Sequence, residues 1–106
     1  MDRQFSLLDS LLEPPRPLSV SDLTAQIKGL LETRFAEVWI EGELSNFKRH
    51  SSGHWYFTLK DAGAAVRCAS FRNSNRYIKF DPADGLAVRV RGRLSLYEPR
   101  GEYQIL

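Results

Sequence analysis

The sequence predicts a mainly β domain of five strands, with an amphipathic helix before the sheet and a short helix inside it. Three observations support this prediction. Apolar residues first recur at helical spacing and then alternate strictly from Val38 onward. Turn-forming Gly, Pro and Asp residues separate the alternating stretches. At 106 residues, the chain has room for a single modest core.

The N-terminal third of the chain is expected to form a leader followed by a helix. Residues 1–17 are expected to form a flexible or docking leader, because prolines end a short leucine-rich stretch there. Residues 21–34 are expected to form an amphipathic helix, since apolar residues recur at i, i+4, i+7 and i+8. Ser19 and Asp22 have the spacing of a capping box at its start. The folded domain is therefore expected to span residues 18–106.

The first three strands are expected between the helix and a central turn-rich stretch. Residues 38–44 alternate as the first strand, and Gly42 lies where a barrel strand would bend. Residues 45–53 are polar and predict a loop. Residues 54–60 and 65–71 then predict a second and a third strand, joined as a hairpin.

The last part of the chain predicts a short helix and two more strands. Alternation stops over residues 72–80, which indicates one or two helical turns. Residues 86–96 predict one long fourth strand after a Pro, Asp and Gly turn. A fifth strand is expected from Glu102 to Leu106. An unpaired edge at this fifth strand would allow self-association with another copy.

This order of elements fits the OB-fold, a small, partly open five-stranded barrel. An SH3-like barrel is the main alternative, but it lacks the helix between the third and fourth strands. A β-sandwich would need more strands.

Charge is distributed unevenly along the chain. Residues 1–45 hold four basic and eight acidic side chains, whereas residues 46–106 hold eleven basic and five acidic ones. Such asymmetry points to a polyanionic partner. The lone Cys68 excludes an internal disulfide and fits a reducing cytoplasm. No secretory signal or membrane span is expected from the sequence.

The second predicted strand carries the clearest candidate for a binding site. Alternation places His54, Tyr56, Thr58 and Lys60 on one face of that strand. Tyr56 and Phe71 are candidates for stacking an unpaired base. The cations expected to neutralise phosphates on the same face and its loops are Lys48, Arg49, Lys60, Arg67, Arg72 and Arg100.

A second group of arginines favours a structural interpretation. Arg89, Arg91 and Arg93 share one face of the fourth strand. Because the first and fourth strands of an OB-fold pair, these arginines are expected near Glu41 and Glu43. They are therefore left out of the predicted site.

The sequence predicts neither a metal site nor a catalytic centre. His50, His54 and Cys68 do not match a common zinc spacing, and Cys68 lies on the apolar side of its strand. No nucleophile and base, and no close carboxylate pair, stand out. No cofactor is expected.

Three stretches of the chain resemble a known family. Residues 38–47, 52–61 and 90–104 are similar to the large subunit of bacterial exodeoxyribonuclease VII, and the resemblance covers residues 18–106. It implies an OB-fold that binds single-stranded DNA ahead of a separate nuclease domain. It also implies a small helical partner subunit and exonucleolytic degradation of single-stranded DNA to oligonucleotides without a divalent metal. By this resemblance the chain is expected to bind DNA and not to cut it.

Two other functions remain open from the residues alone. OB-folds also serve as assembly modules, and the helix face formed by Leu23, Ile27, Leu30 and Leu31 would suit a protein partner. OB-folds also bind RNA, in which case contacts to the 2′-hydroxyl are required.

Overall fold

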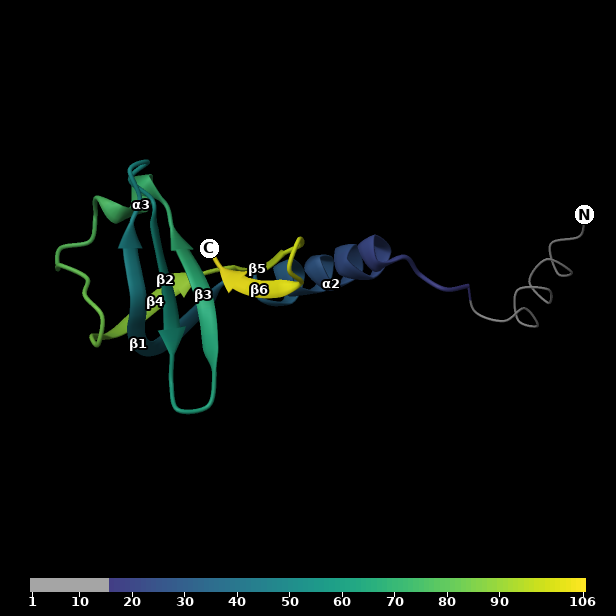
Figure 1. Cartoon of the computed structure of the whole chain (residues 1–106), viewed down its shortest axis with the longest axis horizontal. Coiled ribbons are helices and arrows are strands. Elements are labelled where there is room, and N and C mark those ends of the chain that lie inside the picture. The colour runs from purple at the N-terminus through teal and green to yellow at the C-terminus, as the bar shows by residue number, and fades with distance from the viewer. Residues whose placement is uncertain (1–15) are drawn as a thin grey trace, which may run out of the picture.

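A computed structural model describes residues 16–106, so the predicted leader lies outside the described residues apart from Arg16 and Pro17. The described part forms one curled sheet with two helices (Figure 1). In chain order the elements are α2 (Val20–Arg34), β1 (Val38–Arg49), β2 (Trp55–Lys60), β3 (Ala65–Ser70), α3 (Arg72–Asn75), β4 (Ala87–Gly92), β5 (Leu94–Tyr97) and β6 (Glu102–Ile105).

Helix α2 begins where the sequence predicts. The Ser19 hydroxyl accepts a hydrogen bond from the Asp22 backbone N–H at 3.0 Å, which satisfies one of the free donors of the first turn. The helix lies along β5, where the Ser95 hydroxyl donates to the Glu32 carboxylate at 3.3 Å. At its C-terminal end, the Phe35 carbonyl accepts from the Leu94 N–H at 3.0 Å. The helix is thereby fixed to the sheet by polar contacts, and none of its residues is buried.

The sheet has the strand order β4-β1-β2-β3-β6-β5, with β3 and β6 parallel and the other pairs antiparallel. Its two formal edges, β4 and β5, are halves of one continuous segment interrupted at Arg93. The predicted fourth strand is therefore broken, and its halves pair with different neighbours, which gives six strands where five were expected. This arrangement curls the sheet into the OB-fold barrel.

The expectation of an open fifth strand is wrong. Strand β6 lies inside the sheet, between β3 and β5. Beyond it, Leu106 and Arg93 exchange two backbone hydrogen bonds, of 2.9 and 3.1 Å. Strand β6 is therefore an inner strand of the sheet, paired with β5 along its length and with β3 at Gln104 and Ile105.

Gly92 lies where the sheet closes on itself. A β-carbon at this position would be 2.4 Å from the Leu106 carbonyl oxygen and 2.8 Å from Ile105 Cγ2. Gly42 is similarly tight, since its β-carbon would be 2.9 Å from Leu59 Cγ. Both glycines thus permit an approach that any larger residue would prevent.

Strand β1 continues through residues 45–49, which were expected to form a loop. The register of its pairing with β2 shifts between Ser45 and Lys48, and Asn46 has a φ of 49°. One residue in a left-handed conformation thus lets the strand bulge and resume pairing. As a result Lys48 and Arg49 are strand residues, not loop residues.

The core follows the predicted alternation. The buried apolar side chains come from β1, β2, β3, β5 and β6, and they are Leu44, Leu59, Cys68, Leu96 and Ile105. Burial raises the pKa of the Cys68 thiol to about 12, since removal from water disfavours the thiolate. Cys68 is therefore an unreactive core residue.

Candidate nucleic-acid interface

A groove of about 630 Å³ crosses the outer face of the barrel over β2, β3 and the β5–β6 turn. Four of the eight predicted site residues line it together, namely Lys48, Tyr56, Arg67 and Arg100. They come from four different segments, which the closure of the barrel brings to one surface. The groove is open to solvent and combines aromatic with cationic side chains.

Tyr56 lies at the centre of this face. Its cross-strand partners are Lys48 on β1 and Ala69 on β3, and 44% of its surface is exposed. The Ala69 methyl group is too small to cover a neighbouring ring. The His50 ring stands edge-on to Tyr56, with centroids 6.2 Å apart and planes at 88°. The exposed part of the tyrosine ring offers a surface on which a base can stack.

The cations of the groove differ in how they are paired. Lys48 and Arg100 have no carboxylate at salt-bridge distance among residues 16–106. The Arg67 Nε lies 3.5 Å from a Glu102 carboxylate oxygen, and both side chains are exposed. An exposed pair of this kind contributes at most about 1 kcal/mol, so Arg67 can exchange Glu102 for a phosphate at little cost.

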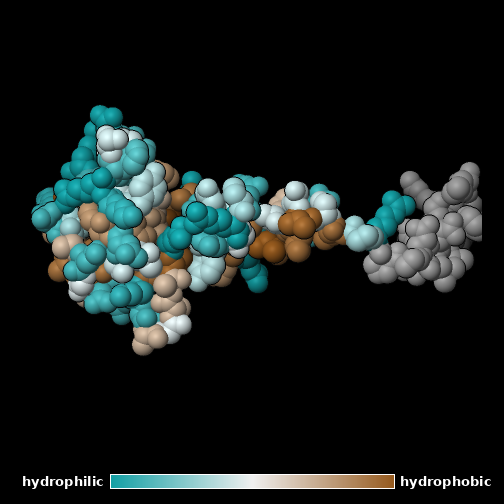
Figure 2. Space-filling model, viewed as in Figure 1, coloured by the Kyte–Doolittle hydropathy of each residue, from teal (hydrophilic) through white to brown (hydrophobic). Residues whose placement is uncertain are grey.

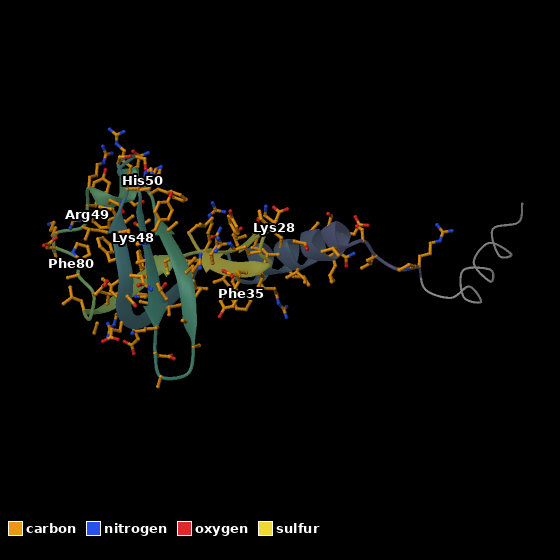
Figure 3. The ribbon with its side chains drawn as sticks, viewed as in Figure 1. Lys28, Phe35, Lys48, Arg49, His50 and Phe80 are labelled. Atoms are coloured by element: carbon orange, nitrogen blue, oxygen red, sulfur yellow. The ribbon has the colours of Figure 1, made fainter. Side chains whose placement is uncertain are left out.

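Two further predicted cations are engaged outside the groove. Lys60 lies 3.7 Å from Glu43, its cross-strand partner on β1. Arg49 forms an ion pair with Asp81, and its guanidinium lies 5.3 Å from the centre of the Trp55 ring. Figure 3 shows Lys48, Arg49 and His50 at the same end of the sheet. Of these three, Arg49 has the least freedom to contact a ligand.

Phe71 and Arg72 lie beyond the groove, at the start of α3. Phe71 is exposed and caps the helix instead of ending β3. The His54 ring stands edge-on to Phe71, with centroids 5.4 Å apart, and its Nδ1 accepts from the Arg72 backbone N–H at 3.0 Å. Phe71 and Arg72 therefore form a second group, connected to the four groove residues through the loop between β1 and β2. Arg49 and Lys60 belong to neither group.

Sequence reasoning missed two tyrosines of the groove. Tyr97 at the end of β5 and Tyr103 on β6 are both exposed and line it beside Arg100. They flank the turn that carries this arginine, and Tyr103 is paired with Leu96 across the hairpin. The hairpin pattern in the sequence was a usable signal, because it places both rings beside a residue already assigned to the site.

Of the three arginines expected near Glu41 and Glu43, two lie beside acidic side chains, and Arg93 has no carboxylate at salt-bridge distance within residues 16–106. Arg89 lies 3.4 Å from Glu41 on β1. Arg91 lies 3.4 Å from Glu37 instead of Glu43, and its guanidinium is 4.6 Å from the centre of the Trp39 ring. Both pairs are exposed, so each contributes at most about 1 kcal/mol.

The described part of the chain brings together no cluster of three or more His, Cys, Asp or Glu side chains that could hold a metal ion. Within residues 16–106, no helix is both long and apolar enough to cross a membrane. The chemistry of the groove is that of binding: rings for stacking and cations for phosphate contacts.

Fold and groove together define a nucleic-acid binding barrel. Residues 18–106 match the family of the OB-fold nucleic acid binding domain, and the chain belongs to this family.

Three curated relatives of the chain carry the same name. The chain is 56% identical over 96 residues to the exodeoxyribonuclease 7 large subunit of Geotalea uraniireducens, covering 91% of the chain and 22% of that protein. It is 55% identical over 97 residues to the same subunit of Hahella chejuensis, covering 92% of the chain and 22% of the relative. It is also 55% identical over 94 residues to the same subunit of Klebsiella pneumoniae, covering 89% of the chain and 20% of the relative. The chain thus spans about a fifth of the length of these relatives.

Proposed function

We propose that the chain binds single-stranded DNA in the groove, with bases stacked on Tyr56 and phosphates held by Lys48, Arg67 and Arg100. The observation that carries this proposal is the open ring of Tyr56 between Lys48 and Ala69. Stacking on a side chain requires a base that is not already stacked and paired within a duplex. A ring beside free cations therefore selects single strands without reading their sequence.

We further propose that the chain is the DNA-holding part of an exodeoxyribonuclease VII large subunit. The identity of 55 to 56% to such subunits supports this assignment. In this proposal the whole protein degrades single-stranded DNA to oligonucleotides without a divalent metal, together with a small helical subunit. Cleavage is assigned to the part of the relatives that the chain does not span. The free, buried Cys68 is consistent with work in the reducing cytoplasm.

The test is a titration followed by fluorescence anisotropy. The 106-residue chain is added to labelled oligothymidine, to the same strand paired with oligoadenine, and to oligouridine RNA, at several salt concentrations. Single-stranded DNA should bind best, with log K falling by about 0.7 per log salt for each neutralised phosphate. Duplex binding as tight as single-strand binding would overturn the proposal. A clear preference for oligouridine would assign the groove to RNA, since only RNA offers a 2′-hydroxyl.

A second candidate function is protein assembly through α2. The apolar residues Leu23, Ile27 and Leu30 of this helix are exposed, and Figure 2 shows hydrophobic surface over the helix. If the chain bound no oligonucleotide at low salt and instead formed oligomers in sedimentation velocity, assembly would be the favoured function. An exposed apolar helix face is a common feature of interaction surfaces.

A further inference from the structure

The segment of residues 71–80 is unusually rich in rings and cations. Within ten residues it holds three aromatic and three basic side chains and no acidic one. Phe71 and Arg72, at its start, belong to the interface described above. The later members Arg76, Tyr77, Lys79 and Phe80 do not line the groove. Tyr77 is 70% exposed, so its ring is not explained by packing in the core. Phe80 is exposed as well, although it also lines an apolar hollow beside Phe47 and Trp55.

The later cations of this segment are not neutralised by neighbours. Arg76 and Lys79 have no carboxylate at salt-bridge distance within residues 16–106. The next acidic residue along the chain, Asp81, is paired with Arg49. The Arg76 guanidinium lies 5.0 Å from the centre of the Tyr77 ring and donates to the Tyr77 hydroxyl at 3.1 Å. This contact sets a cation beside an exposed ring, which is the combination that stacks a base and holds its phosphate.

The segment is held in place by one buried side chain. Asn75 donates to the Gly53 carbonyl at 2.8 Å and to the Ser70 carbonyl at 2.9 Å, and its oxygen accepts from the Ser70 hydroxyl. The Ile78 N–H in turn donates to the Asn75 carbonyl at 3.1 Å. The backbone that carries Arg76 and Tyr77 is therefore hydrogen-bonded up to Ile78, which lowers the entropy lost on binding there.

The loop between β1 and β2 connects residues 71–80 to the groove. His50 of the loop contacts Tyr56, and His54 binds the Arg72 backbone N–H at 3.0 Å. Figure 1 shows α3 at the end of the sheet where β1 passes into β2. A strand that leaves the groove past Lys48 and Arg72 would reach α3 next.

We propose that residues 76–80 form a second contact surface for the same single strand, taking nucleotides beyond those held in the groove. Tyr77 and Phe80 supply stacking faces, and Arg76 and Lys79 supply phosphate contacts. This inference rests on the proposed function of the groove and extends its footprint. Single OB-folds occupy about 4 to 16 nucleotides, so groove and segment together fit the upper part of that range.

The test compares oligothymidines of two lengths, about 5 and about 15 nucleotides, on variants of the 106-residue chain. Tyr77→Ala should weaken the long strand by at least about fivefold and leave the short strand unchanged. The double variant Arg76→Ala with Lys79→Ala should lower the salt slope for the long strand by about 1.4. The matched control, Arg34→Ala with Arg93→Ala, removes the same number of positive charges elsewhere in the chain. It should lower the salt slope for the long strand by clearly less than about 1.4.

The outcomes separate the segment from the groove. Equal losses on both lengths, no loss on the long strand, or an equal effect of the control pair would each overturn the second surface. Tyr56→Ala should weaken both lengths. If Tyr56→Ala changed nothing while Tyr77→Ala weakened the long strand, the groove assignment would fail, and residues 76–80 would be a first contact surface instead of a second one. If the unaltered chain bound neither strand, both would fail. Circular dichroism checks that each variant is folded.

Discussion

Two outer faces of the barrel carry similar side chains but differ in how these are paired. On the face formed by β1 and β4, Trp39 is 65% exposed, yet Arg91 lies over its ring and Glu37 lies against Arg91. On the groove face, Tyr56 has Ala69 beside it, and Lys48 has no carboxylate at salt-bridge distance among the described residues. At Trp39 the neighbouring arginine is paired with a carboxylate, whereas at Tyr56 the neighbouring lysine has none within residues 16–106. Counting aromatic and basic residues therefore does not locate a binding face; their pairing does.

The largest expected effect is on the stability of the whole barrel, which carries both faces. Gly92→Ala places a methyl group 2.4 Å from the Leu106 carbonyl oxygen, where backbone would have to move. We expect a loss of about 3 kcal/mol in the free energy of unfolding, measured by urea denaturation. Gly29→Ala is the control, because nothing lies within 4 Å of its position in α2 and alanine favours a helix. A Gly92→Ala variant as stable as the parent would contradict the tight closure.

The next effect separates the two rings. Tyr56→Ala should weaken binding of oligothymidine by about 1 to 3 kcal/mol, because it removes the stacking face. Trp39→Ala on the other face should leave affinity unchanged, since Trp39 does not line the groove and the arginine beside its ring is paired with Glu37. Fluorescence anisotropy measures both. The comparison between the faces fails if the two variants lose affinity equally.

A smaller effect is expected on the salt dependence of binding, which distinguishes a cation of the groove from one on the other face. Lys48→Ala should lower the slope of log K against log salt by about 0.7, the value for one phosphate contact on a single strand. Arg89→Ala should leave that slope unchanged, because Arg89 does not line the groove. Both variants lose one positive charge, so a difference between them reports position and not net charge. Identical slopes would show that the face of the barrel does not matter.

The smallest effect concerns an acidic residue in the groove. Glu102→Gln should raise affinity less than about fivefold, because it frees Arg67 and removes a negative charge close to the strand. Glu41→Gln makes the same change on the paired face and should leave affinity unaltered. Titrations at one fixed salt concentration are sufficient. An equal gain from both variants would mean that only total charge is sensed.

Local patterns predicted the elements well because they depend on neighbouring residues. The alternation of β2 places Tyr56 outward and Leu59 in the core, as expected. The start of α2 follows from a hydrogen bond between Ser19 and Asp22, three positions apart. Such features are written in short stretches and need no knowledge of the rest of the fold.

Features that depend on distant segments were not predicted. The break at Arg93 arises because the two halves of one segment pair with β1 and β6. The bulge at Asn46 converts an apparently polar loop into strand and brings Lys48 beside Tyr56. The pairing of Arg67 with Glu102 likewise depends on the parallel contact of β3 with β6. For the site, sequence therefore supplied the residue types, and the closure of the barrel decided which of them meet.

At this end of the barrel, the side chain that holds the backbone in place, Asn75, is not one of the side chains proposed to contact DNA. Aspartate lacks the N–H donors that meet two carbonyls here, and glutamine is longer by a methylene, so neither can take its place. The side chains at positions 76, 77 and 79 are exposed and have no share in that task. They can be exchanged while Asn75 is kept, which makes this end of the domain a suitable place for engineering new ligand preferences onto an unchanged scaffold.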